Sequence, residues 1–161
     1  MKKALLLAFC LNFVQIASAQ LEKVLHQTFE LSDSITSVSL NIYGDYEFQK
    51  WSSNTIMVET SIELYDASPS ILNHFVKKGR YDLVFAAKGA MLNLDSKDLE
   101  RTAIKTRVKN KKNQNSDEIE TKQCFEIVKV RVFIPDNFLV VDRTMLNKIV
   151  GEEEATATSN E

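Results

Sequence analysis

Residues 55–64 read Thr-Ile-Met-Val-Glu-Thr-Ser-Ile-Glu-Leu, and their spacing decides the class of fold that we expect. The side chains at alternate positions suit a protein interior: Ile56, Val58, Thr60, Ile62 and Leu64. The positions between them include Glu59 and Glu63. Successive side chains of a strand point to opposite faces, so this alternation predicts a half-buried β-strand.

The same period of two appears on the N-terminal side of this stretch. Residues 36–43 alternate between apolar and polar side chains, and the pattern resumes at 46–48 after the turn signal Gly44-Asp45. A second turn signal, Ser52-Ser53-Asn54, precedes the quoted stretch. We therefore expect residues 36–64 to form a three-strand meander.

Further strands are expected in the second half of the chain. Short alternating or apolar runs at 81–85, 91–94 and 138–141 predict short strands. The longest strand is predicted from Ile119 to Ile134, with one purely apolar face formed by Val128, Val130, Val132 and Ile134. Residues 144–150 are interpreted as a helical turn.

One helix is predicted at about 69–78. Ser68 suits the N-cap, Pro69 suits the first turn and Gly79 suits the end of the helix. Its apolar side chains fall at helical spacing: Ile71, Leu72, Phe75 and Val76. A helix of this length is marginal alone, so it must pack on the sheet.

These elements together predict a mainly β fold, an antiparallel β-sandwich or roll with one short helix packed on it. A truncated β-solenoid is the alternative. The chain has 4 glycines and 2 prolines, which are few for a fold that repeats its turns.

The first residues carry the features of a secretory signal peptide. Lys2 and Lys3 precede an apolar run, and Ala17-Ser18-Ala19 supplies the small residues that a signal peptidase reads. We expect a signal peptide at 1–19 cleaved between Ala19 and Gln20, a single β-rich domain at 20–150 and a disordered acidic tail at 151–161. The protein would then be exported to the periplasm or cell surface, without a transmembrane span in the mature chain.

The charge balance excludes some partners. The sequence has 20 Lys and Arg and 22 Asp and Glu, and two of the lysines lie in the expected signal peptide. The mature chain would therefore carry 18 basic and 22 acidic side chains, a net charge of −4. Nucleic-acid binding normally needs a basic excess, so we expect no nucleic-acid partner.

The sequence shows no constellation for catalysis, a metal or a cofactor. Its two histidines, His26 before the first expected strand and His74 on the helix, have no metal-ligand spacing. Glu59 and Glu63 share a strand face at about 13 Å, beyond the 5 to 9.5 Å of paired glycosidase carboxylates. Cys124 is expected to be a buried apolar residue. We therefore expect a protein that is not an enzyme.

Two groups of residues could contact a partner. The first is a basic stretch around the apolar-free run 109–116, which could meet an anionic glycan or a lipid head group: Lys105, Arg107, Lys109, Lys111 and Lys112. A solvated hairpin tip whose charge keeps the protein soluble is the preferred interpretation. The second is the aromatic pair Tyr43 and Trp51, which could stack on sugars or lie half-buried at strand ends. Arg80, after the helix stop at Gly79, is expected to pair with a nearby acid.

Part of the chain resembles the adhesin-like domains of exported Gram-negative bacterial proteins. The resemblance rests on the runs 35–51 (ITSVSLNIYGDYEFQKW), 54–59 (NTIMVE) and 128–136 (VKVRVFIPD). It implies an envelope-associated role without catalytic residues. The family continues into β-solenoid rungs after the Ile-Pro strand, whereas this sequence has about 25 further residues.

The expected function is therefore an exported, non-enzymatic β-domain with a binding or structural, adhesin-like role at the envelope. Its partner could be an envelope protein or an anionic glycan or lipid head group. The alternative is a small periplasmic protein that handles glycans or lipids, with or without catalysis. A fragment of a longer surface protein is a third interpretation.

Overall fold

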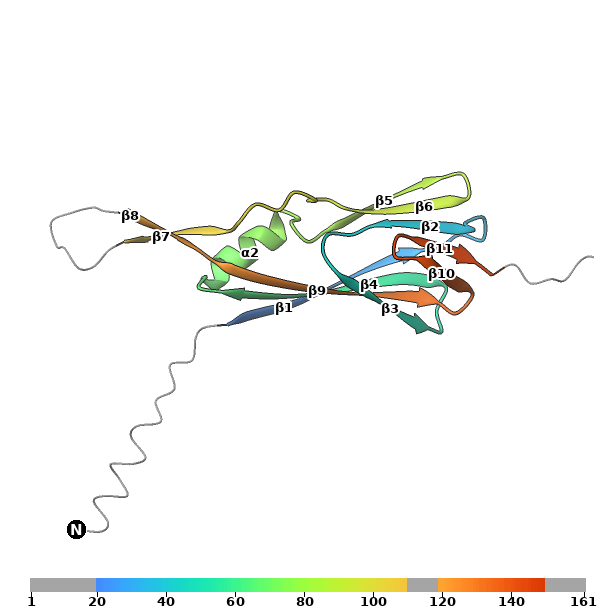
Figure 1. The fold of residues 1–161 in the computed structure, drawn as a ribbon, viewed down its shortest axis with the longest axis horizontal. Coiled ribbons are helices and arrows are strands. Elements are labelled where there is room, and N and C mark those ends of the chain that lie inside the picture. Colours follow the sequence, from blue (N-terminus) through green and yellow to red (C-terminus); the bar gives the residue numbers. More distant parts are fainter. Residues whose placement is uncertain (1–19, 110–118, 150–161) are drawn as a thin grey trace, which may run out of the picture.

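A computed structural model describes residues 20–109 and 119–149, which form a mainly β fold with one helix (Figure 1). The elements follow one another as β1 (Leu21–Glu30), β2 (Ser37–Asn41), β3 (Tyr46–Trp51), β4 (Thr55–Tyr65), α2 (Pro69–Lys77), β5 (Leu83–Lys88), β6 (Met91–Ser96), β7 (Lys105–Lys109), β8 (Ile119–Gln123), β9 (Phe125–Pro135), β10 (Phe138–Asp142) and β11 (Met145–Lys148).

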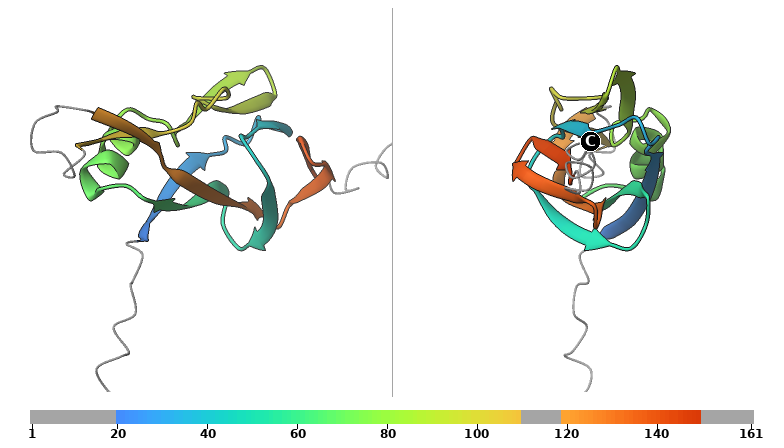
Figure 2. Two further views of the ribbon diagram at one scale, coloured as in Figure 1. Left: turned by 60° about the vertical axis from the view of Figure 1, so that its left-hand side comes forward. Right: turned by 90° about the vertical axis from the view of Figure 1, so that its right-hand side faces the viewer.

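Two sheets face each other as a sandwich. The four-stranded sheet has the order β1-β4-β9-β3, and the five-stranded sheet has the order β10-β11-β2-β6-β5. Figure 1 views these layers from the side, with the five-stranded sheet above, and Figure 2 gives two turned views. Both sheets are mixed, because β3 runs parallel to β9 and β2 runs parallel to β6.

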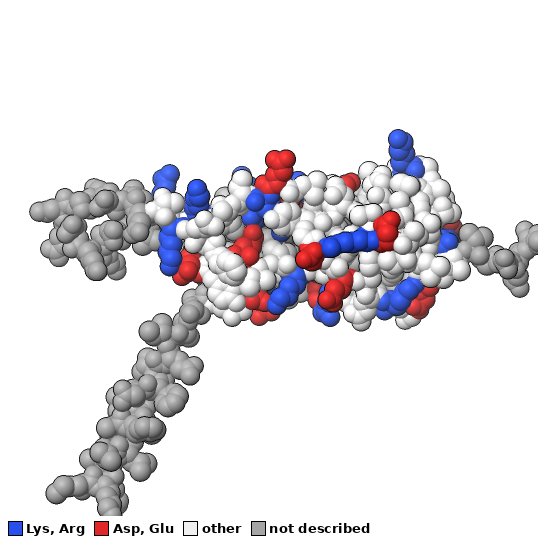
Figure 3. Space-filling model, in the orientation of Figure 1, with Lys and Arg blue, Asp and Glu red and all other residues white. Residues whose placement is uncertain are grey.

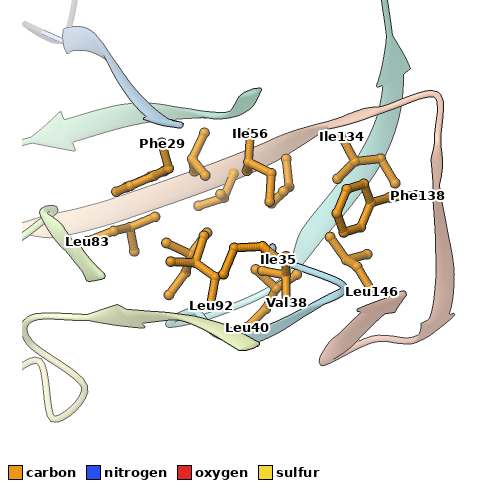
Figure 4. Packing of buried hydrophobic residues seen from close by; sticks show 14 residues of the cluster. Phe29, Ile35, Val38, Leu40, Ile56, Leu83, Leu92, Ile134, Phe138 and Leu146 are labelled. Atoms are coloured by element: carbon orange, nitrogen blue, oxygen red, sulfur yellow. The ribbon is translucent and has the colours of Figure 1, made fainter. Parts of the chain in front are cut away.

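The space between the two sheets holds the larger hydrophobic core, here called the sandwich core. Its buried apolar residues come from both sheets: Phe29, Ile35, Val38, Leu40, Ile56, Val58, Leu83, Leu92, Leu94, Val130, Val132, Ile134, Phe138 and Leu146. Side chains of the two layers point toward one another and interdigitate (Figure 4). Alternation along each strand supplies this core, because every second side chain faces the opposite sheet.

A second core, here called the helix-end core, lies where α2 packs at the other end of β4. Its buried residues are Ile62, Leu64, Leu72, Tyr81, Ile104 and Cys124. Pro69 occupies the first turn of α2, and Gly79 leaves the helix with a φ of +76°. A Cβ at Gly79 would lie 2.5 Å from an Asp82 carboxylate oxygen, so this position needs glycine.

The β-sandwich with one short helix is confirmed, except that the sheets are mixed instead of antiparallel throughout, since β2–β6 and β3–β9 are parallel pairs. Several details are confirmed as well. The helix spans Pro69–Lys77, and it packs on the sheet through Leu72. The apolar face of β9 is buried at Val130, Val132 and Ile134, and Cys124 is buried. Ser68 has the extended N-cap conformation, but its side chain makes no capping hydrogen bond to the helix.

The three-strand meander at 36–64 is wrong. Strand β2 belongs to the five-stranded sheet, whereas β3 and β4 belong to the other sheet and are separated by β9. The Gly44-Asp45 turn therefore passes the chain between layers instead of closing a hairpin. Alternation identifies the buried face of a strand, but it carries no information about which strand lies beside it.

Three other boundaries differ from the expectations. The predicted long strand 119–134 is two strands, since the chain breaks at Cys124, whose backbone N–H donates to the Ile104 carbonyl at 2.8 Å. The predicted helical turn at 144–150 is wrong, because β11 pairs with β10 and β2 and buries Leu146. Strand β1 was not expected, since Lys23 and Gln27 interrupt its apolar alternation.

Within residues 20–109 and 119–149, the single helix α2 lacks the length and apolar character that crossing a membrane requires. The expected signal peptide at 1–19 and the expected acidic tail at 151–161 lie outside the described residues.

Candidate functional site

The outward face of the four-stranded sheet carries a groove of about 630 Å³. It crosses all four strands, and six of its eleven lining residues are charged: Glu22, Asp45, Glu47, Glu59, Lys129 and Arg131. The others are Val24, Tyr46, Ser61, Val128 and Val130. Figure 3 shows the molecule from the side, and acidic and basic side chains neighbour each other along the lower margin, where this sheet lies. The groove therefore presents mixed charge and no patch of one sign.

A cross-strand polar row runs through the middle of this face. The register places His26, Glu59 and Arg131 side by side on β1, β4 and β9, with Glu47 of β3 beyond them. His26 Nε2 lies 3.0 Å from Glu59 Oε2, and Arg131 Nε donates to Glu59 Oε1 at 2.9 Å. These hydrogen bonds from Arg131 and His26 stabilise the ionised form and lower the pKa of the Glu59 carboxyl.

A second carboxylate on the same face is held in a similar way. Lys129 Nζ donates to Glu63 Oε1 at 3.0 Å, and the Tyr65 hydroxyl donates to Glu63 Oε2 at 2.9 Å. The bonds from Lys129 and Tyr65 lower the pKa of the Glu63 carboxyl. Glu59 and Glu63 therefore share a face, as expected, but each is engaged by its own cation. A carboxylate with a lowered pKa is a poor proton donor near neutral pH.

Aromatic pairs stand at both ends of this polar face. The rings of Tyr65 and Phe125 lie 5.9 Å apart at the α2 end, and those of Trp51 and Phe133 lie 5.9 Å apart at the other end. Phe125 is 63% exposed. Phe125 and Phe133 are eight residues apart on β9, which corresponds to about 27 Å at the usual rise of a strand. The face thus offers two aromatic surfaces separated by a charged middle.

A separate polar network closes the helix-end core. Arg80, whose side chain is only 5% exposed, makes a two-pronged ion pair with Glu126: Nε to Oε1 at 3.0 Å and Nη2 to Oε2 at 2.8 Å. The Tyr81 hydroxyl also donates to Glu126, at 2.5 Å. Burial alone would raise the pKa of the Glu126 carboxyl, but the bonds from Arg80 and Tyr81 outweigh it and lower that pKa. The expected pairing of Arg80 with an acid is confirmed.

The two aromatic residues singled out from the sequence contact different neighbours. Trp51 ends β3 beside Phe133, and its indole N–H donates to the Thr55 carbonyl at 2.8 Å. Tyr43 follows β2, and the Arg101 guanidinium covers its ring at 4.3 Å. Trp51 therefore belongs to the outer face described above, whereas Tyr43 packs beside the helix-end network.

Three of the basic residues, Lys105, Arg107 and Lys109, lie on β7, which pairs with β8 at the left-hand end of the molecule in Figure 1. Lys105 and Arg107 are exposed on β7, and Lys109 is the last residue of that strand. Antiparallel pairing of β7 with β8 agrees with the expected hairpin. Lys111 and Lys112 lie outside the described residues, as does the rest of the expected tip at 110–116.

Reasoning from the sequence missed the role of His26, because β1 was not expected. His26 lies on β1 in contact with Glu59, whereas His74 is exposed on α2 and contacts the Phe75 ring edge to face. Among residues 20–109 and 119–149, His, Cys, Asp and Glu side chains nowhere gather in a group of three or more that could hold a metal ion. The sequence did contain one signal for the polar row: acidic residues on one face of β4, Glu59 and Glu63, and basic residues on one face of β9, Lys129 and Arg131.

Comparisons of this chain with protein-family models, with curated proteins and with solved structures gave no significant match. The resemblance to adhesin-like domains therefore stays a prediction from the sequence.

Proposed function

We propose that this protein is an exported, non-enzymatic binding domain whose outer face on the four-stranded sheet binds an extended neutral glycan of the cell envelope. The observation that carries the proposal is the arrangement of this face. An open groove with a charged, hydrogen-bonding middle lies between two aromatic pairs, Tyr65–Phe125 and Trp51–Phe133. Aromatic rings stack on the apolar faces of sugars, and carboxylates and guanidinium groups hydrogen-bond their hydroxyls.

The charges of the groove favour a neutral ligand. Its lining holds four acidic residues and two basic ones, and the two bases are already paired with Glu59 and Glu63. An anionic glycan would meet this acidic excess, and a lipid tail would meet charged walls. Glu59 and Glu63 have lowered pKa values, which supports binding instead of general-acid catalysis.

Affinity electrophoresis in gels that contain a neutral polysaccharide tests the ligand class. We expect retardation of the purified protein, and Phe125→Ser should weaken it by at least about fivefold, the loss of roughly 1 kcal/mol of stacking. Glu59→Gln should also weaken it. Leu139→Ser is the matched control, because Leu139 is similarly exposed, at 55%, but lies on the five-stranded sheet.

Two results would contradict the proposal. Equal retardation of the Phe125→Ser variant and the control would remove the outer face as the site. Retardation by acidic polysaccharides alone would favour the basic β7–β8 pair. Export is tested separately by N-terminal sequencing of the protein from the envelope fraction, where a start at Gln20 is expected and an intact Met1 would refute it.

A further inference from the structure

The two sheets have four edges, and three of them carry features that discourage pairing with another strand. Charged residues occur along β1 and β3, and β10 has a register shift between Val140 and Asp142. Strand β5, Leu83–Lys88, differs: it has no proline, its register with β6 is continuous, and its single charge is Lys88 at the end. Unprotected apolar edges are the edges that recruit another strand.

Strand β5 is also exposed. Val84 is 47% exposed and Phe85 is 66% exposed, and all residues from Val84 to Lys88 are solvent-accessible. The β5–β6 pair projects from the body in the left view of Figure 2, and the corresponding end of the molecule is mostly white in Figure 3. The edge is thus open to a partner along most of its length.

Backbone geometry identifies the groups that face outward. The Gln27 side-chain amide accepts from the Leu83 N–H at 2.9 Å and donates to the Leu83 carbonyl at 3.3 Å, so the backbone groups of Leu83 point away from β6. The backbone carbonyl of Asp82 points the other way, toward the β6 side, because it accepts from the Lys97 N–H at 2.9 Å. Outward and inward positions alternate in an antiparallel ladder, so the groups of Phe85 and Ala87 also point outward. Within the described residues, no hydrogen bond uses them.

We propose that β5 pairs antiparallel with β5 of a second copy of this chain, about a two-fold axis at Ala86. In this register Phe85 of each copy lies opposite Ala87 of the other. The two residues of each such pair exchange two N–H···O=C hydrogen bonds through their outward backbone groups. The Gln27–Leu83 bonds stay intact. The result is an isologous dimer with one continuous sheet across both copies.

Chemical complementarity identifies the second copy as the occupant. The bulky Phe85 faces the small Ala87, and Ala86 meets Ala86 at the axis. Lys88 lies opposite Val84 and one diagonal position from Asp82 of the second copy, on the same sheet face. Diagonal neighbours are about 7–8 Å apart, within reach of a lysine side chain. Two Lys88–Asp82 attractions therefore form, while the two Lys88 side chains stay at opposite ends of the interface.

Sedimentation equilibrium of the purified protein over a concentration series tests this inference. We expect a monomer–dimer equilibrium. Ala87→Pro should give a monomer at every concentration, because it removes an outward N–H without touching the bonds to β6. Lys88→Glu should weaken dimerisation by about tenfold through repulsion of Asp82. Lys78→Glu, on an exposed lysine outside the sheets, is the matched control and should leave the equilibrium unchanged.

Other results would overturn the inference. A wild-type protein that stays monomeric at about 100 μM, well above the Kd of an ordinary stable dimer, would exclude it. A dimer that tolerates both Ala87→Pro and Lys88→Glu would use another surface. Melting curves establish that each variant folds, and if Ala87→Pro does not fold, the Lys88→Glu result decides. Hydrogen exchange gives a second measurement, since the Phe85 and Ala87 amides should become more protected as concentration rises.

Discussion

The sandwich core and the helix-end core share strand β4 but are closed in different ways. Ile56 and Val58 enter the first core, and Ile62 and Leu64 of the same face enter the second. The sandwich core is closed by two sheets whose inward faces are mostly apolar, with the small polar residues Thr60 and Ser96 also buried there. The helix-end core is covered by one short helix and sealed by the Arg80–Glu126 ion pair. Ionised side chains therefore belong to the structure of the helix-end core, whereas the residues of the sandwich core are uncharged.

A charge placed in the sandwich core should have the largest effect. Val132 is fully buried at the centre of β9, and the core around it contains no partner for a carboxylate. Val132→Asp should cost on the order of 5 kcal/mol or more, comparable to the whole stability of a domain. Lys129→Asp, an exposed position on the opposite face of the same strand, is the control. Equal melting temperatures for the two variants would refute the assigned faces of β9.

Removal of the acid from the helix-end core should have the next largest effect. Glu126→Ala leaves the Arg80 guanidinium buried with only the Thr102 carbonyl, at 2.9 Å, and the more distant Asp98 carboxylate, at 3.6 Å. Breaking a buried pair in this way costs about 3–5 kcal/mol. Urea unfolding measures the loss. A cost below that of Glu63→Ala, whose partner Lys129 is exposed, would mean that the ion pair does not seal this core.

The same carboxylate should make the helix-end core sensitive to acid. The pKa of Glu126 is lowered in the folded protein from its ordinary value of 4.5, so the folded state binds this proton less readily than the unfolded state. Its contribution to the free energy of unfolding is complete above about pH 4.5 and is lost as pH falls through the folded pKa. The free energy of unfolding should therefore change less between pH 3 and pH 6 for Glu126→Gln than for the wild type. Parallel curves for the variant and the wild type would contradict this assignment.

The smallest effect is expected at the β7–β8 pair, which lies outside both cores. Lys105 and Arg107 are exposed, so their joint replacement by Ser should change stability by less than about 0.5 kcal/mol. If the basic stretch contacts anions, this variant should lose salt-sensitive retention on an anionic matrix. A large drop in melting temperature would instead show that these side chains support the helix-end core.

The difference between the two cores also explains what could be predicted from the sequence. The sandwich core follows from local alternation, so its buried face on β9 was predictable residue by residue. The seal of the helix-end core joins Arg80 to Glu126, which lie 46 positions apart, and no periodicity connects them. The polar row His26–Glu59–Arg131 depends in the same way on which strands are neighbours. Its first member, His26, lies on β1, which was not predicted because Lys23 and Gln27 interrupt the apolar alternation.

The place of β9 between β4 and β3 has a consequence for the order in which the chain can fold. Strand β3 has β9 as its only partner in the sheet, and Tyr46 pairs with Val130, 84 positions later. Strand β2 likewise takes β11, near the end of the described chain, as a neighbour. Such high contact order slows folding, because distant segments must meet before any sheet is complete. Both sheets can therefore be completed only after the last strands of the described chain have been synthesised.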